Sequence, residues 1–205
     1  MVHAYHAIFT AYGFWLPNDP RGSWTTFVAS WEILRYGLPV PANTRTSIAK
    51  KPHDVARRLA AKQALKYPPV LFTGLHARAI GKGFNTAIKA SGYEILACAI
   101  MTDHVHAVVR RHTQHIERIV GHLKGRATTQ LQSDSLHPLQ DHRNASGEIP
   151  SPWAEKCWKV FLNAPPDIHR AVRYVNQNPL REGLPLQNWY FLEHNRRQTA
   201  SEDAG

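Results

Sequence analysis

Hydrophobic residues recur along most of the chain with the periods of strands and helices. A spacing of about four residues predicts amphipathic helices, whereas continuous or alternating apolar runs predict strands. The segments with helical spacing are about 54–66, 75–90, 114–132 and 166–178. The segments with strand patterns are 3–12, 93–101, 104–111 and 158–162. Because only a short turn separates 93–101 from 104–111, we expect these two strands to pair as a hairpin.

The order of these segments predicts the fold class. We expect an α+β domain over residues 1–205, with a mainly antiparallel sheet and helices packed on one face. Frequent prolines and weak periodicity predict an insertion over 13–74, after the first strand, and residues 196–205 should form a frayed tail. Pro179 should end the last helix, because the residue before a proline avoids the α region.

The helix predicted over 75–90 contains two glycines, Gly81 and Gly83. Each is expected to cost about 1 kcal/mol relative to alanine, so these two positions count against the helix. The apolar spacing of Ile80, Phe84 and Ile88 still favours it, and Gly92 is a suitable residue for its end.

Charge and cysteine content restrict the class of protein. Lys and Arg number 25 against 15 Asp and Glu, a formal net charge of +10. A pI near 9.9 is typical of nucleic-acid binding, although many basic proteins meet nucleic acid only incidentally. Cys98 and Cys157 form no CxxC pair, which argues against a disulfide framework or a cysteine zinc site. With no signal-peptide pattern and no apolar run of about 20 residues, we expect a cytoplasmic, nucleoid-associated protein without a membrane partner.

His104 and His106 are the first candidates for chemistry. They lie two apart in the strand 104–111, so both side chains should point to one face, with Val105 directed into the core. Two imidazoles on one face can hold a divalent metal ion. An HxH pair alone is a weak signal, and in a chain with 13 histidines it is more often a coincidence than a metal site. The barrel of an amidohydrolase, which also uses an HxH pair, does not fit around this mid-chain position.

Tyr174 is the second candidate. On the helix 166–178 it lies between Arg170 and Asn178, one turn away on either side, so the three side chains follow one edge. A tyrosine at the edge of an apolar stripe is most often a packing residue. With a cation and an amide aligned beside it, the hydroxyl could instead be a nucleophile, although its ordinary pKa near 10 requires activation.

The motifs TDHVHAVV and, further along, YVNQNPLREGL resemble the single-tyrosine transposases of the HUH nuclease superfamily, and especially the REP-associated tyrosine transposases. The resemblance covers the strand from His3, the hairpin 93–111 and the region 153–189. It implies an HUH-type, ferredoxin-like fold in which His104, His106 and Asn178 hold Mg²⁺ or Mn²⁺. Residues 13–74 exceed the family's minimal core.

The resemblance also implies an activity. Tyr174 would cleave and rejoin single-stranded DNA beside a hairpin, through a covalent 5′-phosphotyrosine intermediate. A homodimer is left open, since the tyrosine could serve its own subunit's histidines or a partner's. Two other interpretations remain: a transposase-derived DNA-binding protein without cleavage activity, and a metal hydrolase of small molecules, which the positive charge disfavours.

Basic and aromatic residues near these motifs are candidate DNA contacts, through phosphates or stacked bases. These residues are Lys124, Arg126, Arg170, Arg173, Arg181, Arg21 and Trp15. A solvated helix face and a buried aromatic cluster are the ordinary alternatives for such residues.

Overall fold

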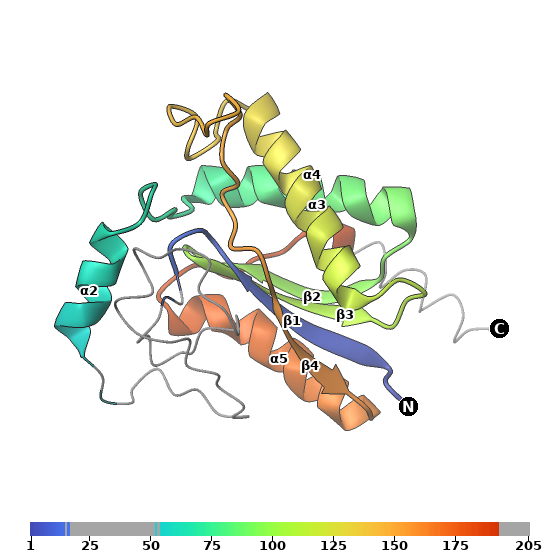
Figure 1. Cartoon of the computed structure of the whole chain (residues 1–205). Helices are drawn as coiled ribbons and strands as arrows, with labels where there is room; N and C mark the ends of the chain where they lie inside the picture. The colour runs from blue at the N-terminus through green and yellow to red at the C-terminus, as the bar shows by residue number, and fades with distance from the viewer. Residues whose placement is uncertain (15, 17–51, 53, 193–205) are drawn as a thin grey trace. The chain divides into compact units, whose positions relative to one another are not determined.

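The computed structural model describes residues 1–14, 16, 52 and 54–192. Strands and helices follow one another along these residues in the order that the hydrophobic pattern predicts (Figure 1). The strands are β1 (Ala4–Thr10), β2 (Ile95–Ile100), β3 (His104–Arg110) and β4 (Trp158–Leu162). The helices are α2 (Val55–Gln63), α3 (Gly74–Ser91), α4 (Ile116–Ser133) and α5 (Pro165–Arg181).

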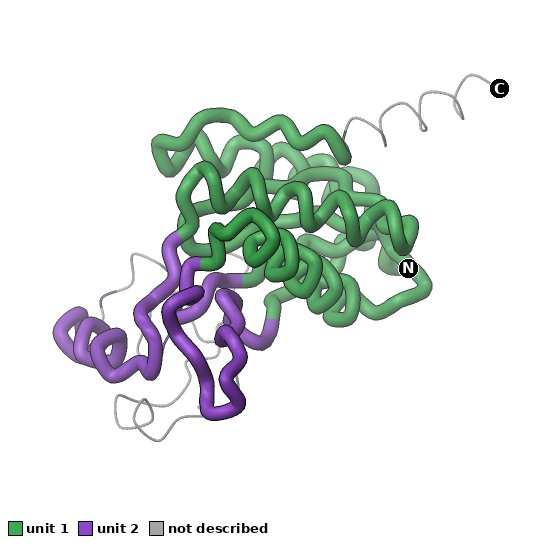
Figure 2. The backbone as a smooth tube through the Cα atoms, turned by 90° about the horizontal axis from the view of Figure 1, so that it is seen from above, with its two compact units in different colours: residues 1–9, 72–137, 157–205 green, residues 10–71, 138–156 purple. Residues whose placement is uncertain are grey.

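The chain divides into two compact units (Figure 2). The first consists of residues 1–9, 72–137 and 157–205, and it holds helices α3, α4 and α5, strands β2, β3 and β4, and all of β1 except Thr10. The second consists of residues 10–71 and 138–156 and contains α2, the short helix predicted near 54–66. In the second unit, Asp54 caps α2 by accepting a hydrogen bond from the backbone of Arg57 at 2.9 Å.

The first unit is built on a four-stranded sheet with the order β2-β3-β1-β4. β2 and β3 pair antiparallel, with Ile100 opposite Val105, as the predicted hairpin requires. β1 and β4 also pair antiparallel, with Ala4 opposite Leu162. The carbonyl of His3, at the start of β1, accepts a hydrogen bond at 2.9 Å from the amide of Arg111, which follows the end of β3. The predicted α+β class with an antiparallel sheet is confirmed.

The helices lie on both faces of this sheet, whereas one covered face was expected (Figure 1). Phe9 of β1 packs against Phe84 of α3, with ring centroids 6.1 Å apart. Ala4 lies on the opposite face of β1 and clusters with Ala171 and Val175 of α5. The apolar stripe of α5 and the apolar side chains on this second face bury each other, which is why α5 does not join α3 and α4.

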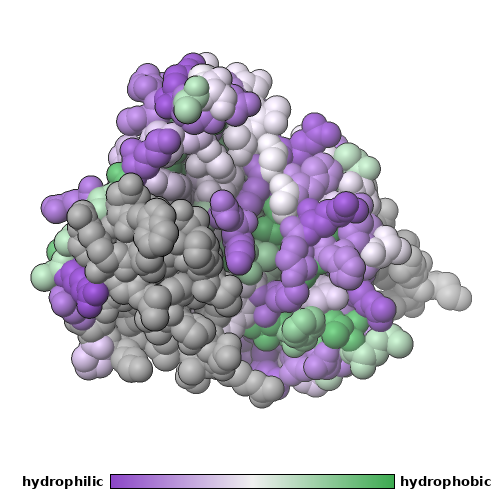
Figure 3. Space-filling model, viewed as in Figure 1, coloured by the Kyte–Doolittle hydropathy of each residue, from purple (hydrophilic) through white to green (hydrophobic). Residues whose placement is uncertain are grey.

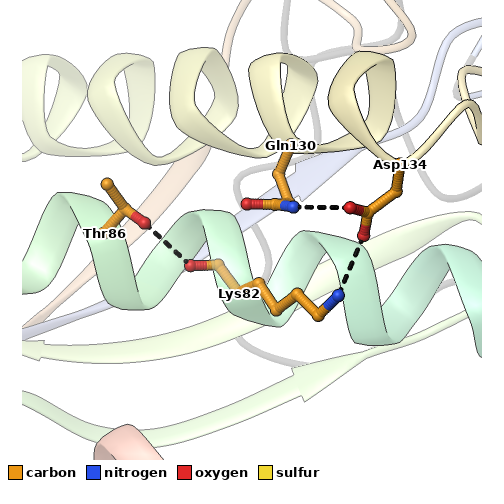
Figure 4. Close-up of polar contacts among 4 residues, drawn as sticks. All are labelled: Lys82, Thr86, Gln130 and Asp134. Carbon is orange, nitrogen blue, oxygen red and sulfur yellow. Dashed lines mark hydrogen bonds and ion pairs between the residues drawn. The ribbon is translucent and has the colours of Figure 1, made fainter.

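Helices α3 and α4 are in close backbone contact at Gly83. A Cβ atom added to Gly83 would lie 2.6 Å from the Cα atom of Ala127, so a larger residue would push the helices apart. Near this contact, Nζ of Lys82 lies 3.1 Å from Oδ2 of Asp134 at the end of α4 (Figure 4). Gln130 also donates to Asp134, at 2.8 Å. Gly83, one of the two glycines that count against this helix, therefore makes its packing against α4 possible.

Helix α5 continues through Pro179 to Arg181, so the expectation that the helix ends before the proline is wrong. Its end is set instead by Gly183, whose φ of 72° lies in the left-handed region that glycine adopts without strain. The amide of Leu184 then donates to the carbonyl of Pro179 at 2.8 Å. Pro179 removes only one amide donor of the helix, and it does so in the last turn, so the earlier turns keep their hydrogen bonds.

The two edge strands of the sheet differ in how they are covered. At Ile100 of β2, the side-chain amide of Gln187 both accepts from the backbone N–H at 2.8 Å and donates to the carbonyl at 2.7 Å. On the other edge, Phe161 of β4 is half exposed, and apolar side chains gather near this strand in Figure 3.

None of the helices in the described part of the chain combines the length and apolar character needed to cross a membrane.

Candidate active site

The paired histidines lie where the strand alternation places them. His104 and His106 project from the same face of β3, and their Nε2 atoms are 3.0 Å apart. Val105 is fully buried on the opposite side of the strand. Helix α5 packs on the sheet face that carries the two imidazoles, with Val175 in its buried stripe.

Each histidine of the pair has a different partner at its other ring nitrogen. Nδ1 of His104 donates to Oδ1 of Asp103, at 2.5 Å. Nδ1 of His106 lies 2.9 Å from Nε2 of His6, which comes from β1, the neighbouring strand. The four side chains therefore form one continuous hydrogen-bonded row: Asp103, His104, His106 and His6.

Burial sets the charge of two members of this row. His6 and His106 are buried, and burial disfavours an imidazolium. Burial lowers the pKa of His6 to about 4. The pKa of His106 is also well below its usual value, because of burial first and then of the neighbouring His104 and His6. Both imidazoles are therefore neutral at neutral pH, which is the form that binds metal ions.

Tyr174 of α5 lies against the histidine row. Its ring centroid is 5.6 Å from that of His106 and 5.9 Å from that of His6, edge to face in both cases. The residue is 39% exposed, so the phenol is accessible from outside. The guanidinium of Arg181 lies over the same ring, 5.3 Å from its centroid. The structure thus brings together Tyr174 and the histidine pair, which the sequence separates by about seventy residues.

Asn178 lies one helical turn after Tyr174 and is only 5% exposed. Its Nδ2 atom is buried and has no hydrogen-bond partner among the described residues. A buried amide N–H group without a partner is costly, so Nδ2 suits a position beside a bound hydrogen-bond acceptor, whereas a metal ion would be ligated by the amide oxygen. The role of Asn178 as a third metal ligand remains a prediction.

The donor set fits a single hard divalent ion. Adjacent ligands around an octahedral ion with bonds of about 2.1 Å are about 3 Å apart, which matches the separation of the two Nε2 atoms. Among the described residues, no group of three or more His, Cys, Asp or Glu side chains is arranged to hold a metal ion. An ion at this pair would therefore complete its coordination with other oxygens, such as an amide, water or phosphate.

The predicted DNA contacts fall into different environments. Lys124 is only 8% exposed, and its Nζ lies 5.5 Å from the centroid of the Phe9 ring, so this side chain does not lie on a solvated helix face. Arg126 and Arg173 are exposed. Arg170 is exposed too, and it pairs with Asp167. Arg21 and Trp15 lie outside the described residues.

Two members of the row were not recognised in the sequence. The hydrophobic pattern places His6 in a predicted strand and Asp103 in a predicted turn, without indicating a role for either. Asp103 could have been suspected, because a carboxylate next to a candidate ligand is a common partner for an imidazole. His6 carries no such local signal, because its position depends on β1 pairing beside β3.

The fold and site define a class of protein in which an antiparallel sheet carries paired histidines facing a tyrosine on a packed helix. Residues 64–148 match the family model described as "Transposase IS200 like". The matched segment contains α3, β2, β3 and α4 with both histidines of the pair, and it ends before Tyr174. The resemblance to these transposases is confirmed over this segment.

Other comparisons are more distant. A solved structure of a REP-associated tyrosine transposase bound to a REP hairpin is similar to this chain with a TM-score of 0.46 and 9% sequence identity. The similarity covers 89% of this chain and 70% of that one. No curated protein sequence matches the chain significantly.

Proposed function

We propose that this protein is a metal-dependent transposase or nickase of single-stranded DNA that acts next to a hairpin. The observation that carries the proposal is the 5.6 Å contact between the rings of Tyr174 and His106, which places a solvent-accessible phenol beside the histidine pair. The match of residues 64–148 to IS200-like transposases supports the same class of activity.

The chemistry follows from the placement of the side chains. His104 and His106, with Asn178, would hold Mg²⁺ or Mn²⁺, and a bound ion supplies Lewis-acid neutralisation of the scissile phosphate. The phenol oxygen of Tyr174 forms a bond to phosphorus as the bond from phosphorus to the 3′ oxygen breaks. The phenol loses its proton, and the departing 3′ oxygen gains one. The products are a 5′-phosphotyrosine link and a free 3′-OH, which the reverse reaction can rejoin.

Exposed arginines on α5 support a DNA partner. Arg181 lies over the Tyr174 ring, and Arg173 is exposed on the same helix. Guanidinium groups bind phosphate oxygens in a bidentate manner, which positions a strand without reading its sequence. We propose that these groups hold the DNA backbone beside the phenol.

The covalent intermediate gives a direct test. The full-length protein is incubated with Mn²⁺ and a library of 3′-labelled single strands that contain a hairpin with randomised flanks. We expect a labelled protein–DNA adduct on a denaturing gel, because the strand that carries the 3′ label receives the 5′-phosphotyrosine. Chelation by EDTA should remove the adduct.

The matched variant is Tyr174→Phe, which removes a single oxygen atom from a partly exposed ring. We expect it to bind the same DNA and to unfold at the same temperature, while adduct formation is abolished. An adduct at the parent level in this variant would exclude Tyr174 as the nucleophile. DNA binding by the parent without any adduct would favour a DNA-binding derivative that has lost cleavage. Sedimentation of the same samples would show whether the protein forms a homodimer.

A further inference from the structure

We propose that His6 is a positioning residue for the metal site. It holds the ring of His106 in the orientation and tautomer that leave Nε2 of His106 available to the ion. This inference rests on the proposed function, because it assigns a role towards the same metal ion.

The geometry of His6 suits this role. Its Nε2 lies 2.9 Å from Nδ1 of His106, the ring nitrogen on the side away from His104. His6 is 9% exposed, and the ring of Tyr174 packs against both imidazoles. The backbone of β1 is held beside β3 by the sheet, so both ends of this contact are fixed. His6 therefore restricts the rotation of the His106 ring.

Hydrogen-bond chemistry determines which tautomers can occur. A carboxylate only accepts, so Asp103 requires a proton on Nδ1 of His104, and a neutral His104 then has a lone pair on Nε2. In the absence of an ion, the 3.0 Å contact between the two Nε2 atoms is satisfied when His106 donates. His6 then donates to Nδ1 of His106.

A bound ion would replace the hydrogen bond between the two Nε2 atoms and reverse the one between His106 and His6. Because the ion needs the lone pair on Nε2 of His106, the proton of that ring must lie on Nδ1, where it donates to Nε2 of His6. His6 must then accept where it previously donated. A neutral imidazole can exchange these roles without a change in charge, whereas a carboxylate or a backbone carbonyl can only accept.

The affinity of the protein for Mn²⁺ measures the positioning role of His6 directly. Calorimetric titration of the full-length protein with Mn²⁺ compares the parent with His6→Leu, which removes the hydrogen bond, and His6→Gln, whose amide can accept or donate. We expect a loss of about 10–100-fold in affinity for His6→Leu, as for other partners of metal-ligating histidines, and substantial recovery for His6→Gln.

Two further variants separate this role from general effects. Phe9→Leu alters a fully buried residue on the opposite face of the same strand, so it should lower the unfolding temperature but leave Mn²⁺ affinity unchanged. His106→Ala should abolish binding. If His106→Ala binds Mn²⁺ like the parent, or the parent itself does not bind, the proposed metal site fails and the inference fails with it. If only His106→Ala loses affinity while His6→Leu does not, His6 is a packing residue and the metal site stands.

Nuclear magnetic resonance provides a readout that does not depend on any variant. In protein with ¹⁵N-labelled histidines, the imidazole nitrogen shifts report which nitrogen of His6 carries the proton. On saturation with Mg²⁺ we expect His6 to carry it on Nδ1, with Nε2 as the acceptor. A proton that stays on Nε2 of His6 in the Mg²⁺-saturated protein would overturn the proposal even if the variants fail to fold.

Discussion

At the scale of the residue, burial decides what a charged or polar side chain can do. Lys124 and Arg126 are two positions apart on α4, yet the first is buried and the second exposed. Lys124 belongs to the apolar stripe that also contains Leu123 and Ala127. A lysine in this position contributes to packing through the long aliphatic part of its side chain. It is therefore poorly placed to contact a phosphate.

This difference predicts unequal effects on DNA binding. Arg126→Ala should weaken binding and reduce the salt dependence, by about 0.7 in the log–log slope if it removes one phosphate contact on a single strand. Lys124→Met, which keeps most of the buried stem, should leave DNA affinity unchanged and alter only the unfolding temperature. Fluorescence anisotropy at several salt concentrations measures the first effect and thermal unfolding the second. A loss of affinity in Lys124→Met as large as that in Arg126→Ala would contradict the prediction.

At the scale of the element, the glycines of the two packed helices differ in whether the packing requires them. Gly83 of α3 faces the backbone of α4, and an added Cβ would approach Ala127 to 2.6 Å. Gly125 of α4 has open space where a Cβ would be built. Both glycines weaken an isolated helix to a similar degree, because each increases the entropy lost on folding. Of these two glycines, Gly83 is the one that the packing of α3 against α4 requires.

The two alanine substitutions should therefore differ in sign. Gly83→Ala is expected to lower the free energy of unfolding by about 1–3 kcal/mol, because two helix backbones must separate. Gly125→Ala should raise it by about 0.5–1 kcal/mol, since alanine favours the helix and meets no neighbour. Chemical denaturation of the matched pair measures both values. Equal effects of the two substitutions would show that the close contact between α3 and α4 is not maintained in solution.

At the scale of the whole molecule, the net charge of +10 favours a polyanionic partner. Part of this charge lies on the helix that carries the candidate nucleophile, where Arg170, Arg173 and Arg181 are all exposed. Arg170 is partly engaged by Asp167, and Arg181 lies over the Tyr174 ring. A strand bound along α5 would therefore pass beside the phenol.

Salt dependence tests this electrostatic contribution. If each of the three arginines neutralises one phosphate of a single strand, they contribute about −2 to the slope of log affinity against log salt concentration. Replacement of all three by glutamine should reduce the slope by this amount and weaken binding at low salt. Binding by the parent that is constant from low to physiological salt would count against a nucleic-acid partner.

The sequence by itself determined the local elements and much of the site. Alternation in a strand was sufficient to place His104 and His106 on one face and Val105 on the other, because side-chain direction in a strand depends only on position. Helical periodicity likewise placed Ile168, Val172 and Val175 in the buried stripe of α5, which the structure confirms. These properties follow from backbone geometry over a few residues.

Only the tertiary structure decided which elements meet. The pairing of β1 beside β3 brings His6 to His106 across about a hundred residues of sequence, and no local pattern encodes that neighbour. The position of α5 on the second face of the sheet depends on which apolar surface remains uncovered after α3 and α4 have packed. The burial of Lys124 and the need for Gly83 arise in the same way, because both depend on atoms that distant segments supply.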